Sequence, residues 1–370
     1  MRNEATFVDL FGGAGGLTLG LARAGWRQLL SVEHWDDAVD THQLNFPDHA
    51  VIDEDIREVT AKRLAGMLEE RPEWVVGGPP CQGFSTVGKR KRDDERNFLM
   101  YEFRRIVEIL EPEGFLIENV LGLKDMSWQE EIAALFEDLG YVVSFHVLRA
   151  ADHGVPQLRR RVVFAGHRVR GYFKGVQPTH PEASWVTVED AIGDLPALEP
   201  GDSATEYDRG PFSDFQREAR RGSQSIQGHQ ISRHPDYLVE AISYIPDGGN
   251  RQSIPDHLQP SSGFHNTYSR LYSKAPAVAV TQNMGKPSGT RCIHPFQNRG
   301  LSAREGARLQ TFPDQFHFTA GLTSQRLQIA NAVPPVLAQA IGSALSDADR
   351  WTTDREEINP DRQTVLDLAA

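Results

Sequence analysis

Cys81 is the residue whose chemistry the sequence singles out first. It is one of two cysteines in 370 residues, and it follows Gly77-Gly78-Pro79-Pro80 at the end of an apolar, β-branched segment, residues 73–76. Such a segment is typical of a buried parallel strand, whose carboxyl end lies where open α/β sheets bind ligands. A thiol placed there after two prolines can act as a nucleophile. The alternative is a small buried hydrophobic residue, the usual role of a free cysteine.

The composition indicates a folded chain of one large or two ordinary domains. Hydrophobic residues make up 39% of it, and no stretch reaches the ~18 uninterrupted apolar residues of a membrane span. The first residues lack the apolar core of a signal peptide, and two cysteines indicate a reducing compartment. We therefore expect a cytoplasmic protein that neither crosses a membrane nor binds a metal.

The net charge of −12 argues mildly against a nucleic-acid partner. Basic residues nevertheless gather in three loop-like segments, at residues 89–92, 159–170 and 217–233. Each segment alone can be a solvated face. Because clustered charge acts locally whatever the net charge is, the three together predict a basic cleft on a negative body.

Alternating strand and helix patterns fill roughly the first 165 residues. Strands are predicted at residues 6–10, 29–32, 73–76, 115–117, 142–148 and 161–165, and helices at residues 16–24, 36–45, 97–110 and 132–139. Repeated βα units of this kind predict an α/β fold, a parallel sheet with helices on both faces.

The character of the chain changes after about residue 170. Residues 171–295 are rich in Pro, Gly, Ser, Gln and His, which predicts a smaller, loop-rich domain with short strands such as 277–281. Helical patterns return at residues 302–311, where Ser302 and Glu305 form a capping box, and at residues 324–343. The tail after Asp349 is polar and is expected to fray.

A ligand site is predicted where the first strand runs into Phe11-Gly12-Gly13-Ala14-Gly15-Gly16 and then a helix. Glycines let the backbone approach a ligand, and a helix N-terminus favours a negative group. Glu33 ends the next strand, where a carboxylate can bind ribose hydroxyls, and Asp55 with Ile56 follows the strand after it, where an acid can accept from an adenine amine. Together they predict an adenosine nucleoside with an attached carboxylate or phosphate. A tight connection is the alternative for the glycines alone.

Six segments resemble, in the same order, the motifs of the cytosine carbon-5 DNA methyltransferases. They are residues 9–16 (cofactor loop), 78–85 (nucleophile), 118–120 (acid), 157–161 (Gln-x-Arg-x-Arg), 299–314 and 331–335. One departure is Ala330, where the family usually has glycine. Six motifs in order around one variable region are far more specific than any one of them.

The resemblance implies methyl transfer from S-adenosylmethionine to carbon 5 of a cytosine flipped out of a specific duplex DNA sequence. It implies that Cys81 adds to carbon 6 while Glu118, kept protonated by burial, gives a proton to ring nitrogen 3. Asn119 would orient the Glu118 loop, Arg161 would reach the exocyclic oxygen of the base, and Arg159 would support the site or a phosphate.

The same resemblance implies further binding residues. Those expected to bind the cofactor are Asp9, Phe11, Gly13, Ala14, Gly15, Gly16, Glu33, His34, Trp35, Asp55, Ile56, Pro80, Leu99, Asn331, Ala332 and Val333. Those expected to bind DNA are Ser85, Lys89, Arg90, Lys91 and Arg92 in a mobile loop, and Arg270 and Thr281 in the variable region.

The implied organisation is a catalytic, cofactor-binding domain of residues 1–170 and 318–350, a target-recognition domain of residues 171–317 and a polar tail of residues 351–370. We expect a Rossmann-like S-adenosylmethionine-dependent methyltransferase sheet, a monomer acting on double-stranded DNA, and a context with a separately acting restriction endonuclease.

Three alternatives remain open. A tRNA-methylating branch of the family shares the core but usually has Pro-Phe-Thr where this chain has Gly83-Phe84-Ser85. An inactive DNA-binding regulator would not need Cys81 and its partners. An NAD oxidoreductase would need glycine at position 18, where Thr18 stands.

Overall fold

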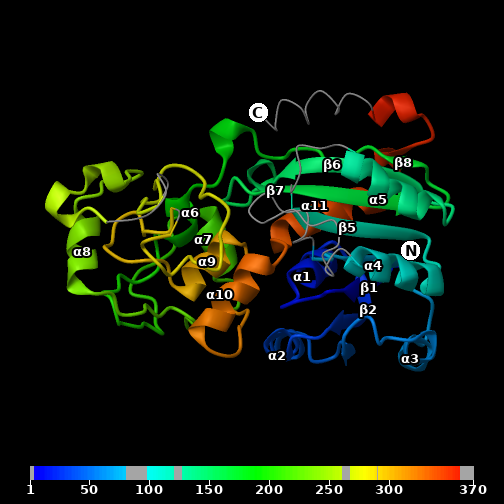
Figure 1. Cartoon of the computed structure of the whole chain (residues 1–370), viewed down its shortest axis with the longest axis horizontal. Helices are drawn as coiled ribbons and strands as arrows, with labels where there is room; N and C mark the ends of the chain where they lie inside the picture. Colours follow the sequence, from blue (N-terminus) through cyan, green and yellow to red (C-terminus); the bar gives the residue numbers. More distant parts are fainter. Residues whose placement is uncertain (1–3, 81–97, 121–126, 261–266, 290, 359–370) are drawn as a thin grey trace. The chain divides into compact units, whose positions relative to one another are not determined.

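The computed structural model describes residues 4–80, 98–120, 127–260, 267–289 and 291–358. The chain divides into two compact units. The first comprises Met1–Arg149, Arg160–Pro178 and Leu337–Ala370, and the second Ala150–Arg159 and Thr179–Val336. Figure 1 follows the chain through both.

A seven-stranded mixed sheet forms the centre of the first unit (Figure 1). Its strands, in the spatial order β3-β2-β1-β4-β5-β7-β6, are β1 (Thr6–Leu10), β2 (Arg27–Glu33), β3 (Val51–Asp53), β4 (Trp74–Gly77), β5 (Gly114–Val120), β6 (Val142–Arg149) and β7 (Arg160–His167). The expectation of a wholly parallel sheet is wrong, because β7 runs antiparallel to both β5 and β6. The link between β6 and β7, residues 150–159, is too short for the helical crossover that parallel neighbours need.

Helices pack on both faces of this sheet, as predicted. They are α1 (Gly16–Arg23), α2 (Asp36–Asn45), α3 (Ala61–Met67), α4 (Phe98–Leu110), α5 (Ser127–Glu137) and α11 (Pro335–Ser346). In α4, Phe103, Ile106 and Val107 recur at helical spacing and enter one core cluster with strand residues. On the other face Trp26 contacts Phe7 and Trp74, with ring centroids 6.2 and 5.1 Å away, and donates to Ser346 of α11.

The chain after Asp349 does not begin as a frayed tail. Trp351–Thr352 forms β9, which pairs antiparallel with β8 (Tyr172–Phe173). Trp351 is 8% exposed, and its ring lies 5.3 Å from those of both His167 and Phe173. A large aromatic side chain therefore anchors a segment that looked polar by composition.

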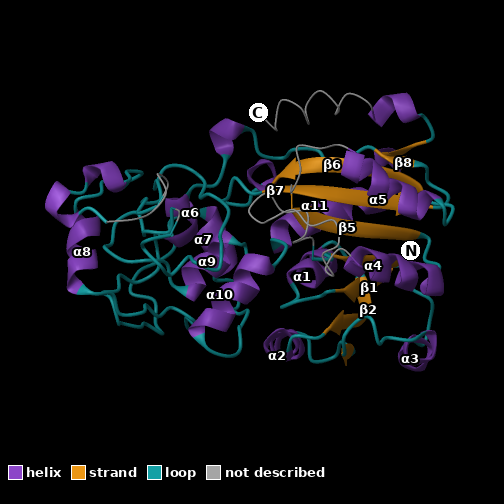
Figure 2. Ribbon diagram, viewed as in Figure 1, coloured by secondary structure: helices purple, strands orange, loops and turns teal. Residues whose placement is uncertain are grey.

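Short helices and long loops make up the second unit (Figure 2). The helices are α6 (Val188–Ile192), α7 (Asp214–Ala219), α8 (Asp236–Ser243), α9 (Ala303–Leu309) and α10 (Leu322–Asn331), with 3₁₀ turns at Ala150–His153, Glu182–Ser184, Arg251–Ser253 and Asp256–Leu258. The predicted strand at 277–281 is wrong: the described residues there hold an isolated bridge between Gln157 and Ala277.

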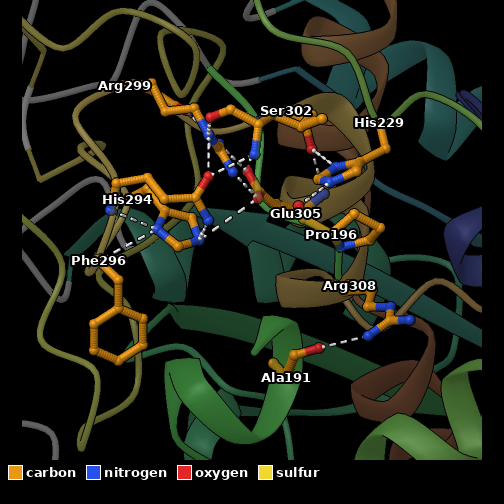
Figure 3. Close-up of polar contacts among 12 residues, drawn as sticks. Ala191, Pro196, His229, His294, Phe296, Arg299, Ser302, Glu305 and Arg308 are labelled. Atoms are coloured by element: carbon orange, nitrogen blue, oxygen red, sulfur yellow. Dashed lines mark hydrogen bonds and ion pairs between the residues drawn. The ribbon is translucent and has the colours of Figure 1, made fainter. Parts of the chain in front are cut away.

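Buried ionic pairs hold α9 in place (Figure 3). The predicted capping box is confirmed, since Ser302 Oγ accepts from the Glu305 amide and Glu305 Oε2 from the Ser302 amide. Arg299 donates to both carboxylate oxygens of Glu305 at 2.9 and 2.7 Å. Burial would raise the pKa of Glu305, but the Arg299 guanidinium outweighs it and lowers that pKa. Loops are thereby fixed where the unit has little regular structure.

The helix predicted over 324–343 is two helices, because α10 ends at Asn331 and α11 begins at Pro335. Proline disfavours the helical conformation of the residue before it, which accounts for a break ahead of Pro334-Pro335. The combined stretch Leu322–Ser346 is long and apolar enough to cross a membrane, but 56% of its most apolar 18 residues are buried in the protein. That result is weak evidence for a membrane segment.

Candidate active site

Glu118 and Arg161 form an ion pair near the carboxyl end of β5, and little of either side chain is exposed. Arg161 Nε lies 2.9 Å from Glu118 Oε1, and the two side chains are 12% and 9% exposed. The antiparallel register pairs Glu118 with Val163 and Val120 with Arg161. Since residues two apart share a face, Glu118 and Arg161 are diagonal neighbours on one face. Burial lowers the pKa of Arg161, and the nearby Glu118 carboxylate opposes that shift.

The next residue, Asn119, ties this edge to the end of β4. Its Nδ2 donates to the Pro79 carbonyl at 3.0 Å, and its Oδ1 accepts from the Val120 amide. A methyl group built on Gly78 would lie 3.6 Å from Glu118 Oε2. The structure therefore brings the predicted acid and its orienting amide to the residues that come before Cys81.

Several predicted residues lie outside the described part of the chain. These are Cys81, Ser85, Lys89, Arg90, Lys91 and Arg92. Pro80, which comes just before them, is exposed, and Leu99, just after, is partly buried against the core cluster.

The glycine turn after β1 has a backbone that ordinary residues rarely adopt. Gly13 and Gly15 have φ values of +54° and +92°, and Phe11, which has a side chain, has φ +60°. A methyl group on Gly13 would meet nothing within 4 Å, whereas one on Gly15 would lie 2.5 Å from the Phe46 ring. There is open space beside the Cα atom of Gly13, whereas Gly15 is packed closely against Phe46. Open space beside the backbone is what a loop that binds a ligand through its main chain requires. Ala14 and Gly16 within it are buried.

Asp9 is buried under this turn with an unsatisfied oxygen. Its Oδ2 accepts from Thr18 Oγ1 at 2.8 Å, while Oδ1 has no hydrogen-bond partner among the described residues. Burial raises the pKa of Asp9 to about 7, assisted by the charge of Glu33 and opposed by the Thr18 hydroxyl. In the sequence, Thr18 served only as a departure from the glycine pattern of NAD-binding proteins. In the structure it is the hydrogen-bond partner of Asp9.

Glu33 joins the second strand to the same turn. Its Oε2 accepts from the Gly13 amide at 2.9 Å, and its Oε1 accepts from the His34 and Trp35 amides. Burial alone would raise the pKa of Glu33, but the His34 side chain and these three amides lower it. An ionised carboxylate therefore stands at the strand end where ribose hydroxyls were predicted to bind. His34 is exposed, Trp35 is half-buried, and the pKa of His34 is raised mainly by its contact with Glu33.

Asp55, which was expected to accept from an adenine amine, is bonded to an arginine in the structure. It pairs with both Nε and Nη2 of Arg57, at 3.0 and 2.6 Å, and these bonds lower its pKa to about 2 against a smaller effect of burial. No pattern in the sequence predicts this pairing. Ile56 beside it is buried in the core cluster.

In the second unit, Arg159 contacts the end of α10. Its Nη2 donates to the carbonyls of Ala330 and Ala332, at 3.2 and 3.3 Å. Of the predicted cofactor residues in this segment, Asn331 is exposed, Ala332 is half-buried and Val333 is buried. Arg159 thus supports the turn, which agrees with a supporting role more than with one on the reacting base.

The expectation that Arg270 contacts the DNA backbone does not match its surroundings. It is 4% exposed, and its five guanidinium hydrogens have protein acceptors: the carbonyls of Ile242, Ile245, His294 and Gln297, and the Asn298 side chain. In this conformation Arg270 has no donor left for a phosphate. Thr281, the other predicted DNA contact in this region, is exposed.

Five of the arginines predicted to line a basic cleft are engaged within the protein. Arg159 is buried, Arg161 is partly buried beside Glu118, and Arg220 pairs with Asp194 while its guanidinium lies 3.8 Å from the centre of the Tyr207 ring. Arg217 pairs with Asp214, and Arg221 pairs with Glu218. In the described part of the chain, no group of three or more His, Cys, Asp or Glu could hold a metal ion.

Comparison with known families gives one consistent match. The model of the C-5 cytosine-specific DNA methylase family matches residues 5–347. Over 347 residues the chain is 42% identical to the Type II methyltransferase M1.HphI of Haemophilus parahaemolyticus, covering 92% of this chain and 86% of the relative. It is 35% identical over 369 residues to M.DdeI of Desulfomicrobium norvegicum, covering 92% and 88%.

Solved structures agree with this match. A candidate DNA modification methyltransferase encoded within an E. coli prophage superposes with a TM-score of 0.76 at 27% identity, over 92% of this chain and 98% of the other. A DNMT2 protein of Spodoptera frugiperda, 14% identical with a TM-score of 0.62, shares the fold.

Proposed function

Because the chain belongs to the C-5 cytosine-specific DNA methylase family, we propose that Cys81, Glu118 and the Gly13 turn perform its reaction at the edge of the seven-stranded sheet. The chain is a DNA (cytosine-5)-methyltransferase that uses S-adenosylmethionine, on a Rossmann-like methyltransferase fold. The observation that carries the residue assignment is the link from Glu118 and Asn119 to Gly78 and Pro79.

Carbon 5 of cytosine is a poor nucleophile until the ring is activated. The Cys81 thiolate forms a bond to carbon 6, and ring nitrogen 3 takes a proton from Glu118, so carbon 5 gains the electron pair with which it attacks a methyl group. A base from the solvent then takes the carbon 5 proton, the sulfur–carbon bond breaks to restore the thiolate, and ring nitrogen 3 returns its proton to Glu118. The target must leave the duplex stack first, at a cost of about a few kcal/mol.

Arg161 has two successive partners in this scheme. In the structure it pairs with Glu118. Once Glu118 takes up from the solvent the proton that it gives to ring nitrogen 3, it no longer attracts the guanidinium, and Arg161 can donate to the exocyclic oxygen of the base, its predicted role. Asn119 holds the strand end in place through Pro79.

The turn after β1 fits S-adenosylmethionine, which supplies the methyl group as a sulfonium when bound. The open space over Gly13 and the ionised Glu33 suit a backbone approach and ribose hydroxyls. The unsatisfied Asp9 Oδ1 below the turn suits a donor. The predicted contacts Asn331, Ala332 and Val333 remain part of this proposal.

Double-stranded DNA is the proposed partner, read by the variable residues of the second unit. The predicted catalytic range included residues 150–159 and 318–336, which belong to the second compact unit, and the predicted recognition range included residues 171–178, which belong to the first. Target recognition by residues 171–317 remains our proposal. We also propose that the enzyme is cytoplasmic and monomeric. The names of its Type II relatives suggest that a separate restriction endonuclease acts in the same context.

Bisulfite sequencing of DNA from cells expressing the chain tests this function and reveals the target sequence. We expect protected cytosines within one short recurring sequence, and none in cells that express Cys81→Ala. Transfer of labelled methyl to tRNA and none to duplex DNA would instead support the tRNA-methylating alternative.

A further inference from the structure

Two glutamines, Gln157 and Gln310, form a continuous line of hydrogen bonds inside the second unit. Both are fully buried. Gln157 Oε1 accepts from the Val280 amide at 2.8 Å, and its Nε2 donates to Gln310 Oε1 at 2.8 Å and to the Leu309 carbonyl at 2.6 Å. The Gln157 side chain therefore connects the 277–281 segment to the end of α9.

Gln310 continues this line to the end of α10. Its Nε2 donates to the carbonyls of Ile329 and Ala332, at 2.6 and 3.1 Å. The last carbonyls of a helix have no partners within it, so side chains must satisfy them. Arg159 donates to Ala332 as well, and to Ala330. The 329–332 turn is thus held by side chains from elsewhere in the chain.

The two amides can be oriented in one way only. The Val280 amide is a donor, so Gln157 must present oxygen to it and nitrogen to Gln310. Gln310 must then present oxygen to Gln157 and nitrogen to two carbonyls. Every amide hydrogen of both side chains is used. Removing the Gln157 amide therefore leaves the Val280 amide and Gln310 Oε1 unpaired, and removing the Gln310 amide leaves the Ile329 carbonyl unpaired and breaks the line.

The two ends of this line lie beside residues with different predicted ligands. Val280 precedes Thr281, predicted to contact DNA, and Ala332 follows Asn331, predicted to contact the cofactor. We propose that the Gln157–Gln310 pair is a positioning device that couples DNA binding at the 277–281 segment to S-adenosylmethionine binding at the 331–333 segment. This inference rests on the proposed function of those two segments.

The coupling is a ratio of affinities, which a merely structural role would leave unchanged. The Kd of S-adenosylmethionine for the 370-residue enzyme is measured with and without saturating duplex DNA that contains the enzyme's target sequence. We expect DNA to tighten cofactor binding by a factor of about 5 or more in the wild type. In Gln157→Met and Gln310→Met the ratio should fall to near one, and the double variant should resemble either single variant.

Gln328→Met is the matched control. Gln328 is buried on α10, but its amide donates to Thr319 and Ser324, away from the line. This variant should lose stability and keep the wild-type ratio. A wild-type ratio in Gln310→Met, or a wild type without coupling, overturns the inference.

A second measurement uses the wild-type enzyme alone, so it does not depend on whether a variant folds. Amide hydrogen exchange at Val280 is followed in the wild type with and without S-adenosylmethionine, in the absence of DNA. Cofactor binding should slow that exchange several-fold, because the Val280 amide is bonded to Gln157. Unchanged exchange overturns the coupling even if the enzyme methylates DNA, whereas a wild type that methylates no DNA overturns the proposed function itself.

Discussion

At the scale of single residues, the site depends on carboxyl groups whose surroundings differ sharply. Asp9 is buried with one hydroxyl partner, Glu33 accepts three backbone amides, and Asp55 is paired with an arginine. Burial favours the neutral acid, whereas amides and guanidinium groups favour the ion. The cofactor side of the site therefore combines a carboxyl that gains a proton near neutrality with two that remain ionised.

Asp9 should make stability fall with rising pH. Because its folded pKa is about 7 and its ordinary value 3.8, the folded state binds more protons between these values, so stability is lost as pH rises through 7. From pH 5 to pH 7 the free energy of unfolding should drop by about 2 kcal/mol in the wild type relative to Asp9→Asn. Urea unfolding at several pH values measures this. Parallel pH profiles for the two proteins would contradict it.

The Glu118–Arg161 pair should show strong coupling in stability. Arg161→Met leaves a buried carboxylate without its cation, at a cost of about 3 kcal/mol. Adding Glu118→Gln should restore most of that stability, while the double variant should remain inactive in methyl transfer because it has no acid at position 118. A double variant no more stable than Arg161→Met would show that the pair is not the cause.

At the scale of elements, the cofactor turn requires glycine at position 15 for two reasons: its positive φ and its close approach to the Phe46 ring. A second glycine with a positive φ but no close neighbour separates the two effects. Gly15→Ala introduces a methyl group against Phe46 at φ +92°, whereas Gly25→Ala meets nothing within 4 Å at a similar φ of +85°. Both should lose about 1–2 kcal/mol of stability from backbone strain. Only Gly15→Ala should also weaken S-adenosylmethionine binding, by about tenfold or more. Calorimetric titration decides, and equal Kd values for the two variants would contradict the packing argument.

Elements with strong local patterns could be predicted from the sequence. The apolar strand ahead of Cys81, the spacing of Phe103 and Ile106 in α4, and the Ser302–Glu305 box each carry their own local signal. The antiparallel β7, the pairing of Trp351 and the burial of Arg270 depend on residues far away in the chain, which local patterns do not contain. The same holds for the partners Thr18, Arg57 and Gln310, which are ordinary polar residues until the fold brings them to their contacts.

At the scale of the whole molecule, a chain of net charge −12 must bind a polyanion through local clusters. Arg217, Arg220 and Arg221 are paired with acids of the protein, and we propose the cations at residues 89–92 as the main candidates for binding phosphates. Binding should then depend strongly on salt, because each phosphate that a cation neutralises releases condensed counterions.

Replacing Lys89, Arg90, Lys91 and Arg92 with alanine tests this assignment. The slope of log K against log salt should become shallower by about 3 to 4, or about 0.9 for each phosphate that the protein no longer neutralises. The control, Arg217→Ala with Arg221→Ala, removes exposed cations already paired with Asp214 and Glu218 and should change the slope far less. Equal changes in both would assign the effect to overall charge.

The account depends most on the sulfur of Cys81, which can be tested by trapping. The enzyme is incubated with S-adenosylmethionine and a duplex carrying 5-fluorocytosine at its target, and the denatured product is analysed by mass spectrometry. Cys292→Ser is the control, because Cys292 is buried, donates to the Lys286 carbonyl, and has a pKa raised by burial to about 12. The account predicts a covalent protein–DNA adduct in the wild type and in Cys292→Ser, attached at residue 81, and none in Cys81→Ala. An adduct formed equally well by Cys81→Ala would contradict it.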